Sequence, residues 1–419
     1  MVEGSIRTIL LLTLILFFTG CSGKSDVGQA QGTVTVQIPV YDSMTNYSLK
    51  NVELFEIENL REVSGAFARF FYAPGSNDTQ LTGGSPVAHF IKSGGFFIPA
   101  DLISTQMASI YYHLQQLAAL DTAVGAGGLN QWPRSVGLET RISENETGRK
   151  NNAFYDGYTD SMMFVPFTSM DLPIALNAGI IAHEHFHSLF FKLVIKTAIA
   201  SKKIMTGATS IHSDEQSAEL SATKSMLMNE VYLRGLNEGL ADFWGWLYTS
   251  DTQFMKWSLP SFSKQRALEM EEAFIGKYMT PAKMDNAIEE ALQISEQPRL
   301  ALIDFSYHVG TPHARFLKQW VTLRSQSESI SLAEAKLKMA QDVVSYLKLL
   351  SVKIAKLEDH EVLSSGDLFF YFINKMVDEK KMNLEQCQFA IAYLNYGIEK
   401  PQEISSCELK DNTLTLVKP

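Results

Sequence analysis

The chain has 419 residues, of which 46% are hydrophobic and 20% are charged, a composition typical of a globular protein and unlike a disordered or fibrous one. Its 36 basic and 46 acidic residues give a formal net charge of −10. Affinity for nucleic acid comes mainly from neutralised phosphates, so this acidic chain without a basic cluster is not expected to bind nucleic acid. Three cysteines are too few for a disulfide scaffold or a four-thiolate zinc site.

The first twenty residues have the pattern of an export signal. Arg7 precedes an apolar run, residues 9–18, which is shorter than the roughly 20 apolar residues that span a bilayer. The run ends in small residues followed by Cys21 and resembles the lipobox of bacterial lipoproteins. That resemblance implies a signal peptide at residues 1–20 and a lipidated tether at 21–32. The alternative is an ordinary signal peptide with an incidental cysteine.

Ser22 follows the cysteine, and in lipoproteins the absence of Asp at this position directs the protein to the outer membrane. We therefore expect a chain in the bacterial cell envelope, facing the periplasm or the cell surface, that contacts the membrane through its lipid anchor only. Export also places Cys387 and Cys407 in an oxidising compartment, where they could form a disulfide worth about 3 kcal/mol. The alternative is two free thiols.

The first part of the chain is expected to be rich in strands. Residues 33–38 alternate between polar and apolar, which favours a strand. Further strands are expected at residues 52–55, 66–72, 136–142 and 162–167, and one long helix at 101–119.

After Asp171 the sequence pattern is helical to about residue 398. The 3.6-residue repeat of a helix is clearest from Ala333 to Lys356. Breaks are expected at Pro260, Pro281, Pro298, Gly310–Pro312 and Gly366. The sequence thus predicts an α+β protein with a β-rich N-terminal lobe, residues 33–170, and a mainly helical lobe, residues 171–419. A groove between lobes is a common place for an active site.

The segment His183-Glu184-His185-Phe186-His187 contains the pattern His-Glu-x-x-His. On a helix, His183 and His187 lie one turn apart on one face, so both imidazoles can bind one zinc ion. Glu184 lies beside them, close enough to act on a zinc-bound water without being a ligand. His185 points to the opposite face and is interpreted as structural or exposed.

The helix that carries this motif is expected to begin at Asp171, as the N-cap, with Pro173 in its first turn. A catalytic zinc needs a third protein ligand. Glu238 is the best candidate, because Asp242 lies one helical turn further on and could accept the second ring N–H of a ligand histidine. Its rivals as ligands are Glu215, Glu219 and Glu230.

These residues together resemble the thermolysin-like branch of the zinc metalloproteases, the gluzincins. The family pattern is present as His183, Glu184, His187, Asn237, Glu238 and Asp242. The resemblance implies the two-lobed zincin fold, one catalytic Zn²⁺ on His183, His187 and Glu238, and Glu184 as the general base. It also implies supporting roles for Asn237 and Asp242, and endopeptidase activity on protein or peptide substrates.

Two further matches concern the substrate. The segment Asn152-Ala153-Phe154 resembles the family's substrate-binding segment, which implies that the Asn152 side chain and the Ala153 backbone hold the peptide. The strand at residues 162–167 is expected to add the peptide to a sheet edge. The alternative is a plain turn that leads into a strand.

Other family features match less closely. His313, in Gly310-Thr311-Pro312-His313, is the candidate for stabilising the oxyanion, with His308 as the alternative. Tyr232 is the nearest candidate for the family's catalytic tyrosine, although its spacing differs. Arg266 and Arg299 are candidates for the arginine that clamps the substrate.

The chain also departs from the family. The stretch from Phe191 to Asn229 is longer than in thermolysin-like enzymes and is interpreted as an extra helical hairpin or loop beside the cleft. The family's cluster of calcium ligands is not recognisable, so Ca²⁺ is not assigned.

Two other functions remain open. One is a non-catalytic or latent zinc-binding lipoprotein of the same fold, although the complete motif argues against it. The other is an aminopeptidase, although no segment resembles the site by which those enzymes recognise a free amine.

Overall fold

The computed structural model describes residues 31–43, 46–77, 80–141, 150–204, 224–269, 281–294, 301–358, 361–363, 365–394 and 406–417. The predicted signal peptide, the lipidation site Cys21 and most of the tether lie outside these residues. So do Glu215 and Glu219, the candidate Arg299 and the centre of the stretch from Phe191 to Asn229.

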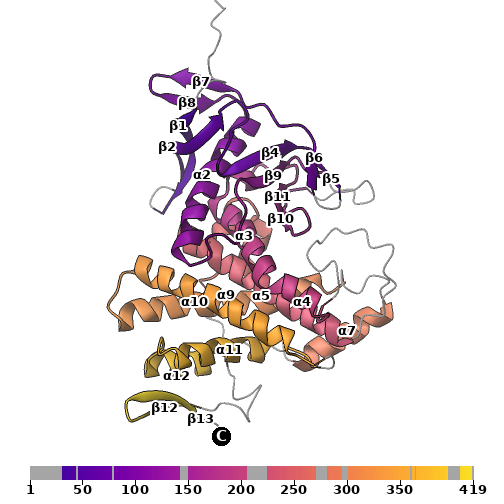
Figure 1. Cartoon of the computed structure of the whole chain (residues 1–419), viewed down its shortest axis with the longest axis vertical. Helices are drawn as coiled ribbons and strands as arrows, with labels where there is room; N and C mark the ends of the chain where they lie inside the picture. The colour runs from indigo at the N-terminus through magenta and orange to yellow at the C-terminus, as the bar shows by residue number, and fades with distance from the viewer. Residues whose placement is uncertain are drawn as a thin grey trace, which may run out of the picture.

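Two sheets form the N-terminal part of the protein (Figure 1). The first has the strand order β3-β2-β1-β8-β7, and its β1 and β2 form a long antiparallel pair. Val34, Val36 and Ile38 are buried on one face of β1, which confirms the strand expected from the alternating pattern. The strands are β1 (Gly32–Asp42), β2 (Asn46–Asn59), β3 (Ser64–Gly65), β7 (Phe90–Ser93) and β8 (Phe96–Pro99).

The second sheet has the order β10-β11-β9-β4. Its strands β4, β9 and β11 are parallel, and β10 is antiparallel to β11 at the edge. The strands are β4 (Ala68–Tyr72), β9 (Arg134–Leu138), β10 (Ala153–Asp156) and β11 (Ser161–Phe164), and a small hairpin joins β5 (Gly75–Asn77) to β6 (Gln80–Thr82). The prediction that residues 162–167 bind substrate at an edge is therefore wrong: β11 is bonded on both sides, and β10 is the edge strand.

Helix α2 (Leu102–Ala123) packs against β1, β2 and β4. It begins where the sequence predicts, because the Asp101 side chain accepts a hydrogen bond from the backbone N–H of Ser104. Its buried face includes Met107, Ile110, Tyr111 and Leu114.

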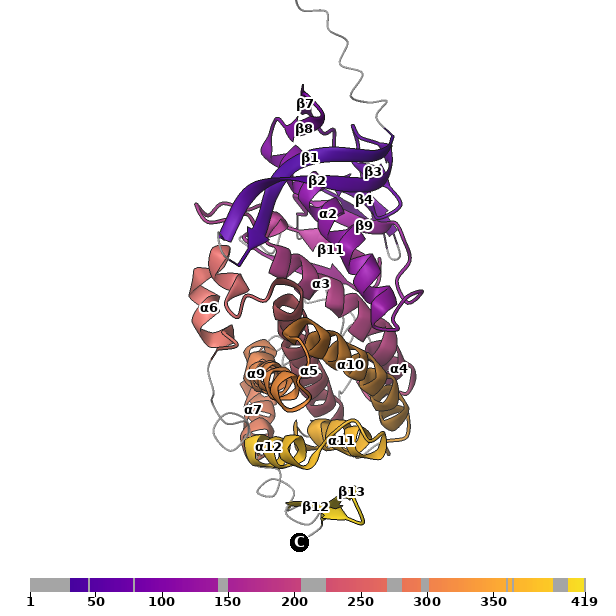
Figure 2. The same ribbon diagram turned by 90° about the vertical axis from the view of Figure 1, so that its left-hand side faces the viewer.

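The rest of the described chain is mainly helical, and Figures 1 and 2 show these helices packed below the two sheets. The helices are η2 (Ile174–Leu176), α3 (Ala178–Phe190), η3 (Phe191–Ile195), α4 (Lys196–Ala200), α5 (Lys224–Thr249), η4 (Phe254–Trp257), α6 (Pro260–Arg266), α7 (Pro281–Ile294), α9 (Ile303–Ser327), α10 (Leu332–Ala355), α11 (Ser365–Asp378) and α12 (Leu384–Leu394). The protein is thus mixed α and β, with a helical C-terminal region. None of the helices in the described part is long and apolar enough to cross a membrane.

Two predicted helix boundaries are wrong. Helix α3 begins after Asn177, whose side chain accepts hydrogen bonds from the N–H groups of Gly179 and Ile180, so the N-cap is not Asp171. The expected break at Gly310–Pro312 is absent, because α9 continues through Pro312. Proline removes one backbone hydrogen bond, and packing of α9 against α5 overrides that local preference.

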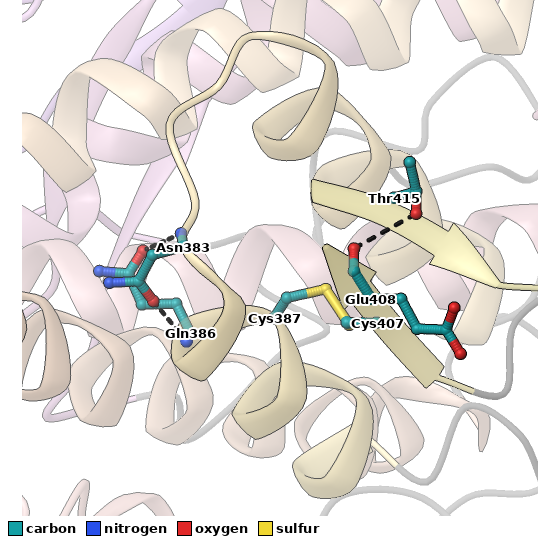
Figure 3. Close-up of a disulfide and its surroundings, with 6 residues drawn as sticks. All are labelled: Asn383, Gln386, Cys387, Cys407, Glu408 and Thr415. Carbon is teal, nitrogen blue, oxygen red and sulfur yellow. Dashed lines mark hydrogen bonds between the residues drawn. A yellow bond between two sulfur atoms is a disulfide. The ribbon is translucent and has the colours of Figure 1, made fainter. Parts of the chain in front are cut away.

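The chain ends in a hairpin that the sequence did not predict, formed by β12 (Ser406–Lys410) and β13 (Thr413–Val417). A disulfide with a Cα–Cα distance of 6.1 Å joins Cys387 on α12 to Cys407 on β12 (Figure 3). The pairing expected from the sequence is therefore present, and it ties the hairpin to the helical region.

Reduction of this disulfide is expected to lower the free energy of unfolding by about 3 kcal/mol, because the unfolded chain regains the freedom of a loop of this size. Urea denaturation of residues 22–419, with and without reductant, measures the difference. The double variant Cys387→Ala/Cys407→Ala is the control, because reductant should not change its midpoint. An oxidised and a reduced wild type with the same midpoint would contradict the prediction.

Candidate metal centre

Helices α3 and α5 bring the predicted ligands together. His183 and His187 lie one turn apart on α3, and their Nε2 atoms are 3.1 Å apart. Glu238 extends from α5 and places Oε2 3.5 Å from the His183 Nε2 and Oε1 3.9 Å from the His187 Nε2. Two imidazoles and one carboxylate therefore converge on one point, although α3 and α5 are separate segments.

A second set of side chains orients the two imidazoles. The His183 Nδ1 lies 3.1 Å from the Asp242 carboxylate, and the His187 Nδ1 lies 2.9 Å from the Asn237 amide oxygen. An acceptor at Nδ1 favours a proton on that atom, which leaves the Nε2 lone pair free for a metal. When both Nε2 atoms are deprotonated, their lone pairs point to the same place, an arrangement that a cation between them would stabilise. The buried group His183, Glu184 and His187 can thus hold a metal ion.

Arg266, at the end of α6, holds the two carboxylates of the site in place. Its Nε and Nη2 atoms lie 2.9 and 2.7 Å from the two Asp242 oxygens, and Nη2 lies 3.1 Å from the Glu238 Oε2. The ring of Tyr307, on α9, lies 4.5 Å from the Arg266 guanidinium. The sequence offered Arg266 only as a possible substrate clamp and did not identify Tyr307.

Burial and neighbouring charges shift the titration of these groups in the metal-free protein. Burial, reinforced by Glu238, raises the pKa of Glu184 to about 7. Burial disfavours the charged form of His183, but Asp242 and Glu238 outweigh it and raise the His183 pKa to about 9. Burial and the His183 charge lower the pKa of His187 to about 4. Glu184 can therefore gain or lose a proton near neutral pH, as a general base must.

Three glycines let α5 and α9 touch backbone to backbone. A Cβ atom on Gly239 would lie 2.1 Å from the Gly310 carbonyl oxygen, and one on Gly310 would lie 2.3 Å from the Gly235 oxygen. Only glycine fits at so close an approach. The contact brings α9, and with it Tyr307, to the predicted ligand Glu238.

The predicted ligands line a cleft whose wall includes the edge strand. Asn152 and Ala153, the residues expected to bind substrate, line this same cleft. Its apolar lining falls into two groups: Ile174, Ile180, Met255 and Leu259 near the start of α3, and Phe191, Ile195 and Ile204 beyond its end. Glu230, Arg234, Arg266 and Tyr307 complete the polar lining.

The structure does not bring the predicted oxyanion residues to this cleft. His313 lines a separate apolar cavity with Leu236 and Leu240; its Nδ1 lies 2.7 Å from the Val309 carbonyl oxygen and its ring stacks on Phe369. Tyr232 is fully buried and is not part of the cleft lining.

The two remaining histidines near these motifs are also outside the cleft. The alternative His308 is exposed and does not line it. His185 is buried on the opposite face of α3, 2.9 Å from Asp121, in agreement with its structural interpretation.

His313 is expected to make stability depend on pH. Burial lowers its pKa to about 3, whereas a histidine in the unfolded chain titrates near 6.5. The neutral His313 therefore contributes fully to the free energy of unfolding above about pH 6.5, and this contribution is lost as the pH falls towards 3. At pH 5 the free energy of unfolding is lower by about 2 kcal/mol for this reason. In His313→Phe, the difference in unfolding free energy between pH 7 and pH 5, measured in urea, should shrink by that amount. An unchanged difference would contradict the buried, neutral state.

No protein-family model matches the chain, and no curated protein is significantly similar to it.

Proposed function

We propose that this protein is a zinc-dependent endopeptidase with the two-lobed fold of the thermolysin-like gluzincins. The observation that carries the proposal is the convergence of His183, His187 and Glu238, with Glu184 beside them in a cleft bordered by an edge strand. A metal site without catalysis would require neither a buried carboxylate beside the two histidines nor an edge strand along the cleft.

Zinc suits this donor set, because two imidazoles and one carboxylate are a common set of ligands for catalytic zinc. His183, His187 and Glu238 would hold the ion. When bound, it polarises the scissile carbonyl and lowers the pKa of a bound water towards 7. Asp242, Asn237 and Arg266 keep the three ligands in position.

The chain's own residues supply the remaining chemistry. Glu184 accepts a proton from the attacking water and passes it to the leaving amine. Asn152 and Ala153 hold the substrate backbone against β10, the edge strand of the described sheet, so that the peptide extends the sheet.

Tyr307 takes the role that the sequence assigned to His313 or Tyr232. The charge of Glu238 and burial raise the pKa of its hydroxyl, so it stays protonated and can donate a hydrogen bond to the oxyanion.

The proposed location is the bacterial outer membrane, reached through lipidation of Cys21. The disulfide between Cys387 and Cys407 supports export, because such bonds persist in oxidising compartments. The membrane partner would be the lipid bilayer, through the anchor, and the substrate would be a protein or peptide.

The test is hydrolysis of an unfolded protein by residues 22–419, with the metal content of the same sample measured. Cleavage of peptides with a blocked N-terminus, together with about one zinc ion per chain, is the expected result. Cleavage of peptides with a free N-terminus only would indicate an aminopeptidase. Bound zinc without any cleavage would favour the non-catalytic zinc-binding lipoprotein.

A further inference from the structure

One cation in the cleft has no role in the metal centre. Arg234 lies on α5, one helical turn before the ligand Glu238, and is half-buried in the cleft lining. It makes no hydrogen bond or ion pair with any residue that the structure describes. Arg266, by contrast, is held by Asp242 and Glu238. Of the two arginines in the cleft lining, Arg234 is the one whose guanidinium no described residue engages.

The direction of α5 fixes the end of the cleft in which Arg234 lies. Asn237 contacts His187 and Asp242 contacts His183, so α5 runs antiparallel to α3 along the ligands. Residues of α5 that precede Asn237 therefore lie beyond His187, on the side away from His183. Arg234 thus shares the end of the cleft that contains Phe191, Ile195 and Ile204.

The edge strand points towards the same end. Tyr155, near the end of β10, has its ring 6.0 Å from the Phe191 ring, and a Cβ on Gly157 would lie 2.8 Å from Phe191. Strand β10 therefore runs towards the end that holds Arg234. A peptide that pairs with β10 in the more stable antiparallel sense runs the other way. Its residues before the scissile bond would then lie at Arg234.

We propose that Arg234 is a specificity residue that selects substrates with an acidic side chain before the scissile bond. This inference rests on the proposed endopeptidase function. One helical turn is about 5.4 Å, and an extended peptide advances about 3.4 Å per residue, so the contact falls about two residues before the cleaved bond. The apolar side chains Phe191, Ile195 and Ile204 at this end reduce solvent screening of this ion pair, whereas Glu230 lies one turn further back on α5. The charge of Arg234 disfavours lysine or arginine at the same position.

The test uses two readouts on matched peptides with Glu, Gln or Lys two residues before the cleaved bond. One readout is kcat/KM of the wild type and of Arg234→Gln. The other is peptide binding, by fluorescence polarisation, to zinc-loaded Glu184→Gln with and without Arg234→Gln. We expect the Glu peptide to be preferred over Gln about fivefold to tenfold in both, and the preference to vanish with Arg234→Gln. Arg234→Glu should favour the Lys peptide.

Two controls separate this inference from the proposed function. Arg61→Gln, an exposed arginine on the turn after β2, should leave the preference intact. Peptides with free and amidated C-termini show whether Arg234 binds a terminal carboxylate instead. The inference would be overturned if wild type and Arg234→Gln cleaved with the same preference, or if the preference followed the terminal carboxylate. Either result would leave the proposed endopeptidase function unaffected. Absence of both cleavage and binding would overturn the function and the inference with it.

Discussion

Replacing Glu184 by Gln is expected to lower peptide hydrolysis at least a hundredfold while leaving about one zinc ion per chain. Gln has nearly the shape of Glu but cannot accept the proton from the attacking water, so the loss should be about 10²- to 10⁴-fold in kcat. The metal should stay, because the proposed ligands are His183, His187 and Glu238. Single-turnover hydrolysis and metal analysis on the same samples measure both quantities.

The matched control is Glu334→Gln, the same substitution at a partly exposed carboxylate in the first turn of α10. It should leave both hydrolysis and metal content unchanged. Turnover of Glu184→Gln near the wild-type rate would remove Glu184 from the mechanism. Loss of the metal would instead make Glu184 a ligand or a support of the ligand set.

Replacing Gly239 by Ala is expected to destabilise the fold and to impair the site together. In a helix this change normally stabilises by about 1 kcal/mol, because alanine has the higher helix propensity. Here the new Cβ would meet the Gly310 carbonyl oxygen at 2.1 Å, so α5 and α9 must separate. We expect the free energy of unfolding to fall by about 3 kcal/mol, and hydrolysis to fall because Glu238 and Tyr307 lie on the separating helices.

Urea denaturation and kcat/KM of the same preparation measure the two effects. Gly95→Ala is the control, because a Cβ there has open space around it and the change should stay within about 0.5 kcal/mol. A Gly239→Ala variant as stable as the wild type would mean that the two helices do not approach so closely.

The motif residues could be placed from the sequence because their geometry is local. His183, Glu184 and His187 lie within five positions, and helical periodicity alone sets their relative directions. Glu238 and Asp242 could be assigned for the same reason, as a pair one turn apart. Arg266 and Tyr307 reach the site from other segments, and no local pattern reveals which distant residues meet.

The error at His313 has a specific cause. The prediction assumed a break at Gly310–Pro312, after which the chain could turn His313 towards the cleft. Because α9 is continuous, Tyr307 and His313 lie six positions apart, about 240° around the helix. Only one of them can face the cleft, and it is Tyr307. The prediction that residues 162–167 form the edge strand is wrong for a related reason. Which strand lies at an edge depends on the hydrogen-bond pairing of the whole sheet, which no local pattern reveals.

The partners of the two imidazoles have a consequence for the protein before it meets an ion. Asp242 and Asn237 hold the rings of His183 and His187 in the metal-free protein, so binding requires little reorganisation. Because its pKa is raised to about 9, His183 carries a proton on Nε2 near neutral pH, 3.1 Å from the His187 Nε2, and a metal ion must displace that proton. The converged ligands exist in the folded chain and not in the unfolded one, so the free energy of unfolding rises with the logarithm of the ion's free concentration once this exceeds the Kd. For such a protein, scarcity of the metal would lower the stability of the fold as well as the activity of the site.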